Sequence, residues 1–385
     1  MSVGAVDLRP GPRPGRRSSL SRSPTVGVEE EFTLVDPASG AVVPCAAEVI
    51  DDCADPTLVV PEVMSYMVET RTPVCRNLAE VRAGLTAGRT RVTRSAHRLA
   101  AVAIASGVNP FGLPEHVQLA EGARYAELAR RFPLPIRTSG TCACHVHVAV
   151  PTRQVGVEVL LRLRPWLPTL LALTANSPLW MGRESRWASQ RFALVSRWPT
   201  AVPPPPVCSI DEYDALVRDA VRSGAALDAR NVYFLARLSP RYPTVEVRVA
   251  DVCLTTAEAT CYAGLVRALV ATTVDEATRG LASTTVRERA LRRACRSAAS
   301  AGLGGTMTDP LTGERVRAWR MVEQLVEHVE PRLRAHGDDE AVLATLDWLR
   351  RVGGGAERQR RLFREAGSPA AFLAVLARAS GARAG

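Results

Sequence analysis

Residues 244–251 read Thr-Val-Glu-Val-Arg-Val-Ala-Asp and form the clearest β-strand pattern in the chain. Successive side chains of a strand point to opposite faces of the sheet, so the valines share one face while Glu246 and Arg248 share the other. The valine face predicts packing against a core. The other face carries an acid and a base that a half-buried strand does not need. This stretch therefore predicts a sheet with one apolar face and one functional face.

Three other predicted strands carry the same kind of polar pair, at positions two residues apart. They lie within residues 27–32, 67–71 and 142–148, and the pairs are Glu29 with Glu31, Glu69 with Arg71, and His145 with His147. Taken alone, each pair is typical of a solvated strand face or of core packing. If the four strands are neighbours in one sheet, however, their polar faces converge into a single patch.

Such a patch would hold four carboxylates, and like charges at short range need cations to neutralise them. The carboxylates are those of Glu29, Glu31, Glu69 and Glu246. Hard oxygen ligands in this number favour Mg²⁺ or Mn²⁺, and a histidine can join them. Arg71 and Arg248 would then face phosphate or carboxylate oxygens. Carboxylates, divalent metals and arginines without an obvious nucleophile favour phosphoryl transfer from ATP.

The composition excludes several classes of function. The chain has 385 residues, 46% of them hydrophobic, which is typical of a globular protein, and its longest apolar run is too interrupted to span a membrane. All 49 basic residues are arginine, which excludes a catalytic lysine, a Schiff base and a Walker-type lysine. A net charge of +10 suits anionic small substrates, and an aromatic content of 5% argues against nucleic-acid binding. Nine cysteines and no signal peptide predict reduced thiols and a cytoplasmic location.

The pattern along the chain predicts one tail and one domain. Residues 1–24 are rich in Pro, Gly, Ser and Arg, which predicts a disordered tail, and residues 25–380 are expected to form a single domain. Apolar spacing predicts a helix over 78–105 and a kinked helix over 155–174. Strands fall mainly in the first two thirds of the chain and do not alternate strictly with helices. This favours an α+β fold with an antiparallel sheet over a doubly wound parallel sheet.

Several motifs, in order along the chain, resemble those of the carboxylate–amine ligase family, also called glutamate–cysteine ligase type 2. The resemblance covers about residues 25–365. It rests on TVGVEEEFTLVDP at 25–37, VETRTPVC at 68–75, CHVHV at 144–148, RLRPWLP at 162–168, ANSP at 175–178, RWPTA at 197–201, RYPTVEVRVAD at 241–251, DPLTG at 309–313 and GGAERQ at 354–359.

The resemblance implies a glutamine-synthetase-like catalytic fold. In this fold a curved antiparallel sheet holds ATP and metal ions on its concave face, and helices pack on its convex side. The resemblance also implies ATP-dependent joining of a carboxylate, typically the γ-carboxylate of glutamate, to an amine such as cysteine. The reaction would pass through an acyl phosphate and release ADP and phosphate.

Site residues can be carried over from the family position by position. Its metal ligands fall on Glu29, Glu31, Glu69, His147 and Glu246. Arg248 falls on the arginine that contacts phosphate or substrate, and His145, on the same strand face as His147, is a further candidate contact to the nucleotide. The implied partners are small molecules, namely an amino acid, an amine, and ATP with Mg²⁺ or Mn²⁺. A homodimer is left open.

Two alternatives and three departures from the family's pattern accompany this prediction. A metal-dependent hydrolase would use the same carboxylates and histidines to activate water. A zinc site in residues 142–147 is disfavoured, because strand alternation places the cysteines and the histidines on opposite faces.

The departures from the family's pattern are Met67, Arg186 and Leu235, which are candidates for lining the substrate pocket.

Overall fold

The computed structural model describes residues 23–381. Residues 1–22, which make up most of the predicted disordered tail, lie outside the described residues, as do residues 382–385. The extent of the single domain, residues 25–380, stays a prediction.

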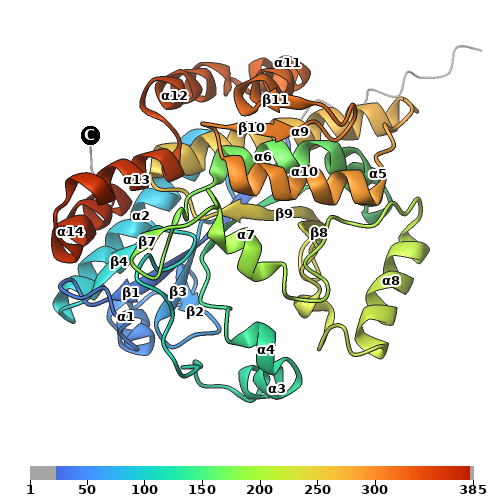
Figure 1. The fold of residues 1–385 in the computed structure, drawn as a ribbon. Helices are drawn as coiled ribbons and strands as arrows, with labels where there is room; N and C mark the ends of the chain where they lie inside the picture. Colours follow the sequence, from blue (N-terminus) through green and yellow to red (C-terminus); the bar gives the residue numbers. More distant parts are fainter. Residues whose placement is uncertain (1–22, 382–385) are drawn as a thin grey trace, which may run out of the picture.

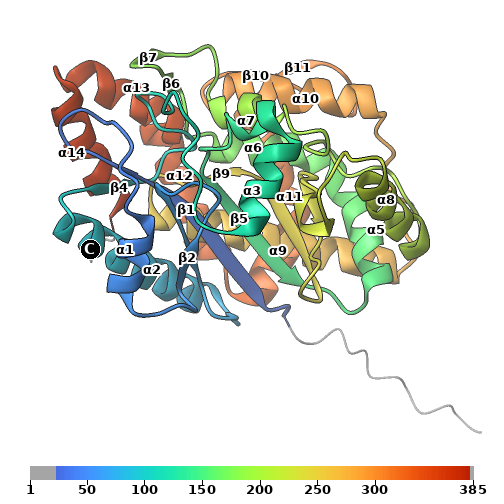
Figure 2. The same ribbon diagram turned by 90° about the horizontal axis from the view of Figure 1, so that it is seen from below.

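A seven-stranded sheet forms the centre of the molecule (Figures 1 and 2). Its strands are β1 (Val26–Val35), β2 (Val59–Pro61), β3 (Met67–Arg71), β4 (Val102–Ile104), β5 (Ala143–Ala149), β8 (Ala236–Leu238) and β9 (Thr244–Asp251). They run in the order β2-β3-β1-β5-β9-β8, and β4 pairs with part of β1. Each of these strand pairs is antiparallel. The predicted α+β fold with an antiparallel sheet is therefore confirmed.

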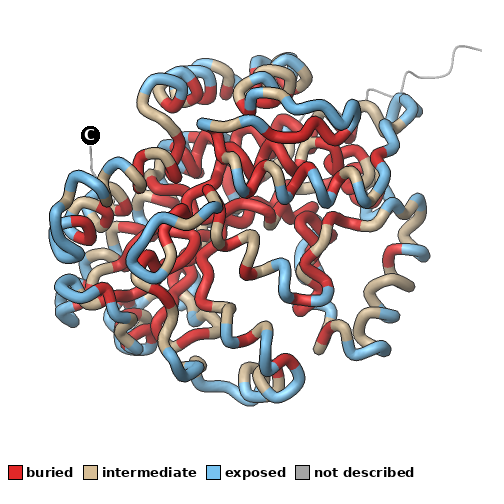
Figure 3. Tube along the Cα trace, viewed as in Figure 1, coloured by how far each residue is buried: buried red, intermediate tan, exposed pale blue. Residues whose placement is uncertain are grey.

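Helices cover one face of this sheet. The helices that cover this face include α2 (Leu78–Arg98), α5 (Arg153–Leu163), α6 (Leu167–Thr174) and α9 (Thr256–Thr278). The alternating valines of β1, β5 and β9 pack into the same apolar core as these helices. An outer set of helices packs on them: α11 (Ala318–His336) and α12 (Asp339–Val352) lie above α9 in Figure 1, and α10 (Glu288–Ala301) packs against α6. α9 is enclosed between the sheet and this outer set of helices. Figure 3 shows the buried residues concentrated along the sheet and the helices above it.

The remaining elements are shorter or lie outside the two helical sets. They are α1 (Ala46–Cys53), α3 (Ala123–Arg131), α4 (Pro133–Ile136), α7 (Gln190–Val195), α8 (Ile210–Arg222), α13 (Gly355–Glu365), α14 (Pro369–Ser380), the strand pairs β6 (Leu179–Trp180) with β7 (Arg183–Glu184) and β10 (Thr306–Thr308) with β11 (Arg315–Arg317), and the 3-10 helices Arg164–Trp166 and Ala229–Asn231. In Figure 1, α3 and α4 lie below the sheet, on the side away from α9. Among residues 23–381, no helix is both long enough and apolar enough to cross a membrane.

The predicted helix over 78–105 is wrong in its last part. α2 ends at Arg98, and Val102–Ile104 form β4 instead. Ala100 leaves the helical path with a φ of 55°, in the left-handed region. Pairing of β4 with β1 outweighs the helix propensity of the alanines in this segment. The predicted kink within 155–174 is confirmed, because α5 and α6 are separated by a 3-10 turn that contains Pro165.

Glu30, the middle one of three consecutive glutamates in β1, points to the helical side of the sheet. It forms an ion pair with Arg89 of α2, with 2.9 Å between Nε and Oε2, and both side chains are fully buried. Arg89 also donates hydrogen bonds to the backbone carbonyls of Cys253, Leu254 and Ser380. A buried charge is tolerated only when it is paired and hydrogen-bonded in this way. One guanidinium therefore joins β1, α2, the segment before α9 and the end of α14.

Candidate active site

The strand register brings the predicted site residues onto one face of the sheet. The pairs lying directly opposite each other are Glu29–Arg71, Glu29–His145, Glu31–Glu69 and His147–Glu246. Residues opposite each other on antiparallel strands point to the same face. All eight predicted residues, including Arg248, line a single cavity of about 210 Å³. The face is the one opposite the helical layer.

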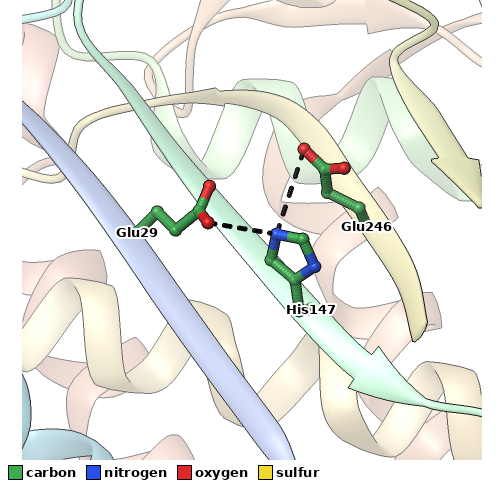
Figure 4. Close-up of side chains that lie close together, drawn as sticks. All are labelled: Glu29, His147 and Glu246. Carbon is green, nitrogen blue, oxygen red and sulfur yellow. Dashed lines mark ion pairs between the residues drawn. The ribbon is translucent and has the colours of Figure 1, made fainter. Parts of the chain in front are cut away.

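Glu29, His147 and Glu246 form the first group of candidate metal ligands. His147 Nε2 lies 3.5 Å from Glu29 Oε1 and 3.9 Å from Glu246 Oε1 (Figure 4). This Nε2 is buried and has no hydrogen-bond partner among the described residues, whereas Nδ1 lies 3.1 Å from Thr244 Oγ1. The contact of Nδ1 with Thr244 thus fixes the orientation of the ring, and Nε2 faces the carboxylates of Glu29 and Glu246. Metal-binding histidines are held in the same way.

Glu31, Glu62 and Glu69 form the second group, and one carboxylate oxygen of each lies within 4.8 Å of the others. Burial and the nearby Glu62 raise the pKa of Glu31 to about 8. Burial likewise raises the pKa of Glu62, and burial together with repulsion from Glu29 raises that of Glu69. Three carboxylates this close need either protons or a cation to neutralise them. The donor set therefore fits a divalent cation with oxygen ligands.

Arginines compensate part of this negative charge. Arg71 Nε lies 2.6 Å from Glu69 Oε1 and 3.9 Å from Glu29 Oε1. Arg248 pairs with Glu246, and Arg237 binds the same carboxylate through hydrogen bonds of 2.8 and 3.2 Å. Burial acts to raise the pKa of Glu246, but the two arginines hold it below its usual range. Both predicted arginines thus contact carboxylates of the two metal-ligand groups directly.

His145 lies between Glu29 and Arg248. Its Nδ1 is 3.4 Å from Glu29 Oε2 and 3.4 Å from Arg248 Nη1. Burial and the charge of Arg248 lower the pKa of His145 to about 4, so the ring is neutral at pH 7. Burial acts to raise the pKa of Glu29, whereas His145 and His147 lower it below its usual range. Within residues 23–381, His145 belongs to neither ligand group, and its predicted contact with a nucleotide stays a prediction.

Two of the charged residues that the sequence-predicted set lacks contact the predicted carboxylates directly. Arg237 lies in β8, directly opposite Glu246. The turn Ser-Pro-Arg-Tyr-Pro at 239–243, between two apolar segments, is a hairpin signal that would have placed Arg237 there. Glu62 follows β2, whose pairing with β3 places it beside Glu69. No comparable signal marks Glu62, because a three-residue strand shows too little alternation to be recognised.

Segments outside the four predicted strands complete the cavity wall. α3 contributes Arg124 and Tyr125, and the turn between β8 and β9 contributes Arg241 and Tyr242. Arg124 is held by Asp228 through two hydrogen bonds of 3.0 Å. Arg241 therefore adds positive charge to the wall, which suits an anionic ligand, whereas Asp228 balances the charge of Arg124.

The three departures from the family's pattern do not line this cavity. Leu235 and Met67 are buried in separate apolar clusters, and Arg186 is exposed. We expected these three residues to line the substrate pocket, and at the carboxylate cavity this expectation is wrong. Leu235 and Met67 fail to reach it because their side chains pack into the apolar core.

Glu62→Gln is expected to remove one divalent-cation site while leaving the other intact. The amide keeps the size of the side chain but lacks the negative charge that a hard cation requires. Calorimetric titration with Mn²⁺ should show two sites per chain in the unaltered protein and one in the variant. Glu48→Gln on α1, an exposed position away from the cavity, is the matched control and should retain both sites. Two undiminished sites in Glu62→Gln would remove Glu62 from the ligand set.

Comparison with known sequences identifies the family. The sequence model of glutamate–cysteine ligase family 2 matches residues 25–372 of this chain. A protein of Mycobacterium sp. (strain KMS), provisionally named glutamate–cysteine ligase 2-2, is 42% identical over 363 residues, which cover 94% of this chain and 100% of the relative. A Salinispora tropica protein, provisionally named glutamate–cysteine ligase 2, is 41% identical over 356 residues, covering 92% of this chain and 94% of the relative.

Solved structures share the fold at low sequence identity. The bifunctional glutathione synthetase of Pasteurella multocida has a TM-score of 0.67 and 16% identity; the match covers 93% of this chain and 52% of that one, so this chain spans about half of that enzyme's length. The glutamate–cysteine ligase of Francisella tularensis, solved in complex with AMP, has a TM-score of 0.56 and 12% identity and covers 93% and 92% of the two chains. These likenesses confirm the predicted fold, and the sequence match over residues 25–372 shows that the chain belongs to glutamate–cysteine ligase family 2.

Proposed function

We propose that this protein is an ATP-dependent carboxylate–amine ligase that activates the γ-carboxylate of glutamate and joins it to an amine such as cysteine. The observation that carries the proposal is the pair of ligand groups on one sheet face, five carboxylates and one histidine walled by arginines. Family membership supports the ligase class. The names of the relatives support glutamate and cysteine as the first substrates to test.

The chain's donor atoms fit two Mg²⁺ ions. Glu29, His147 and Glu246 would hold one, and the three glutamates of the second group would hold the other. The fit rests on the buried, unpartnered Nε2 of His147 and on the mutual repulsion of the second group. Bound there, the ions would supply positive charge to the β- and γ-phosphates of ATP.

The reaction needs no protein nucleophile. A substrate carboxylate oxygen attacks the γ-phosphorus of ATP, ADP leaves, and an acyl phosphate forms. The amine nitrogen then attacks the acyl carbon and loses a proton, and the carbon–oxygen bond to phosphate breaks. Phosphorylation supplies the leaving group that a free carboxylate lacks. The protein's contribution is to position the reactants and to stabilise charge.

The arginines of the cavity would orient the anionic groups. Arg248 and Arg71 are both partly buried, and they donate to Glu246 and Glu69 respectively. Both guanidinium groups line the cavity and carry more donors than these contacts use. The remaining N–H groups can bind phosphate or carboxylate oxygens with fixed geometry.

An ADP-release assay distinguishes this ligase from a hydrolase that uses the same residues. With Mg²⁺, glutamate and cysteine, we expect ADP formation that falls to the background level when either the acid or the amine is omitted. Mass spectrometry should show an amide between the two substrates. A panel of other amines extends the test if cysteine is not accepted. Cleavage of a substrate by water without ATP would instead support the hydrolase.

A further inference from the structure

The segment between β2 and β3 lines two cavities. Glu62 belongs to the carboxylate cavity, whereas Met64 and Tyr66 line a second cavity of about 820 Å³. None of the metal-ligand residues lines this second cavity. Its volume lies within the range of cavities that hold small organic molecules, roughly 300–1,000 Å³. The reaction proposed above gives it no role.

Most of the wall of the second cavity is apolar. Met64 and Ile136 are buried, and Leu134 on α4 is 76% exposed. Val117 and Pro114 also contribute to the wall. A largely exposed leucine beside buried apolar side chains leaves apolar surface that a ligand can cover. An occupant with an apolar body would gain free energy by removing this surface from water.

Two arginines make the second cavity electropositive. Arg137 follows α4 and Arg197 follows α7, and both line the cavity. Within residues 23–381, neither guanidinium forms an ion pair or a hydrogen bond. Glu115, which also lines the cavity, pairs with neither of them. The two charges are therefore available to an anion.

Tyr66 adds a buried polar group to the same cavity. The residue is 1% exposed, and its side chain lines the cavity. A phenol hydroxyl at a cavity wall can donate a hydrogen bond to an acceptor oxygen of a ligand. Arg197 is held in place by the next residue, because the buried Trp198 donates from Nε1 to Ser139 Oγ at 3.1 Å and packs on Phe132 at 5.2 Å. The packing of Trp198 thus fixes the backbone position from which the exposed Arg197 lines the cavity.

We propose that this second cavity binds an organic monocarboxylate with an apolar body. The carboxylate lies between Arg137 and Arg197 and accepts a hydrogen bond from Tyr66, and the apolar body covers Met64 and Ile136. Two guanidinium groups and one hydroxyl match the acceptor oxygens of a carboxylate. This binding goes beyond the ligase reaction and needs neither ATP nor metal.

Binding to metal-free protein tests the proposal independently of catalysis. Four probes with apolar bodies are titrated by calorimetry in the presence of EDTA: 3-phenylpropionate, 4-methylpentanoate, phenylalanine and leucine. At least one should bind, and 3-phenylpropanol, which lacks the charge, should bind at least about tenfold more weakly than 3-phenylpropionate. Arg137→Gln with Arg197→Gln should weaken the bound probe by about tenfold or more. Tyr66→Phe, which keeps the ring, should weaken it about threefold.

A matched variant separates a specific site from general charge. Arg94→Gln with Arg378→Gln removes two exposed arginines that line a different, mostly apolar cavity between α2 and α14. This control should leave probe affinity unchanged. Equal weakening by both double variants would overturn the proposal, as would failure of all four probes to bind. Either result would leave the ligase assignment untouched, because the assay contains no ATP or metal.

A second arm identifies where such a carboxylate comes from. In the complete reaction mixture, incorporation of phenylalanine or leucine into an amide product would mark the cavity as part of the acceptor site. A change in ADP release caused by 3-phenylpropionate, without incorporation, would mark it as an effector site. Both outcomes require loss of the effect in the Arg137 and Arg197 double variant, and an effect that persists there would overturn the proposal.

Discussion

Glu29→Gln is expected to lower ADP formation by at least about 100-fold, because the amide removes a charge on which the first ligand group depends. Glu29 contacts His147 at 3.5 Å and His145 at 3.4 Å, and its carboxylate lies at the centre of the site face. The glutamine keeps the side chain's shape and changes only its charge. ADP release and calorimetric Mn²⁺ binding, measured on the same preparation, should fall together.

The folded state should tolerate this change. Glu29 raises the pKa of Glu69 by repulsion, so removing its charge relieves repulsion within the cavity. The midpoint of chemical unfolding should therefore stay the same or rise. Undiminished ADP formation in Glu29→Gln would show that the first group is not the catalytic metal site.

Arg89→Met is expected to reduce the free energy of unfolding by about 3–5 kcal/mol, the typical cost of leaving a buried charge without its partner. Glu30 would be left without its partner on the helical side of the sheet, where it is fully buried. The carbonyls of Cys253, Leu254 and Ser380 would also lose a donor. Chemical denaturation followed by circular dichroism measures the loss.

A double variant separates charge from packing in this prediction. Adding Glu30→Leu to Arg89→Met removes both charges and should recover a large part of the lost stability, since apolar residues of similar volume can replace a buried ion pair. The recovery should be incomplete because the three carbonyls remain without their donor. If the double variant is no more stable than Arg89→Met, the uncompensated charge of Glu30 is not the cause of the loss.

The sequence was sufficient to predict the cavity-lining residues that lie on strands with clear alternation. β1, β3, β5 and β9 each carry polar residues at every second position, and strand geometry alone places those residues on one face. The same alternation separates Glu30 from Glu29 and Glu31. What the sequence could not supply was the order of the strands, which brings these faces together.

The parts that were missed depend on contacts distant in sequence. Glu62 joins the site only because β2, a three-residue strand, pairs with β3. β4 forms where alanine-rich sequence favours a helix, because the edge of β1 offers it unpaired backbone groups. Met67 and Leu235 were expected at the substrate pocket, yet both point into apolar clusters. Local pattern does not reveal pairing of this kind, since it reflects propensity and not tertiary partners.

The three consecutive glutamates of β1 also constrain how the sheet can assemble. If β1 slipped by one residue against its neighbours, every side chain would change face. Glu29 and Glu31 would then point to the helical side, where Arg89 can pair with only one of them. Of the three acids of β1, only Glu30 would face the cavity. Such a misaligned sheet would be destabilised by buried charge without a partner. The alternation of the three acids and the pairing of Glu30 with Arg89 therefore favour the observed register of β1.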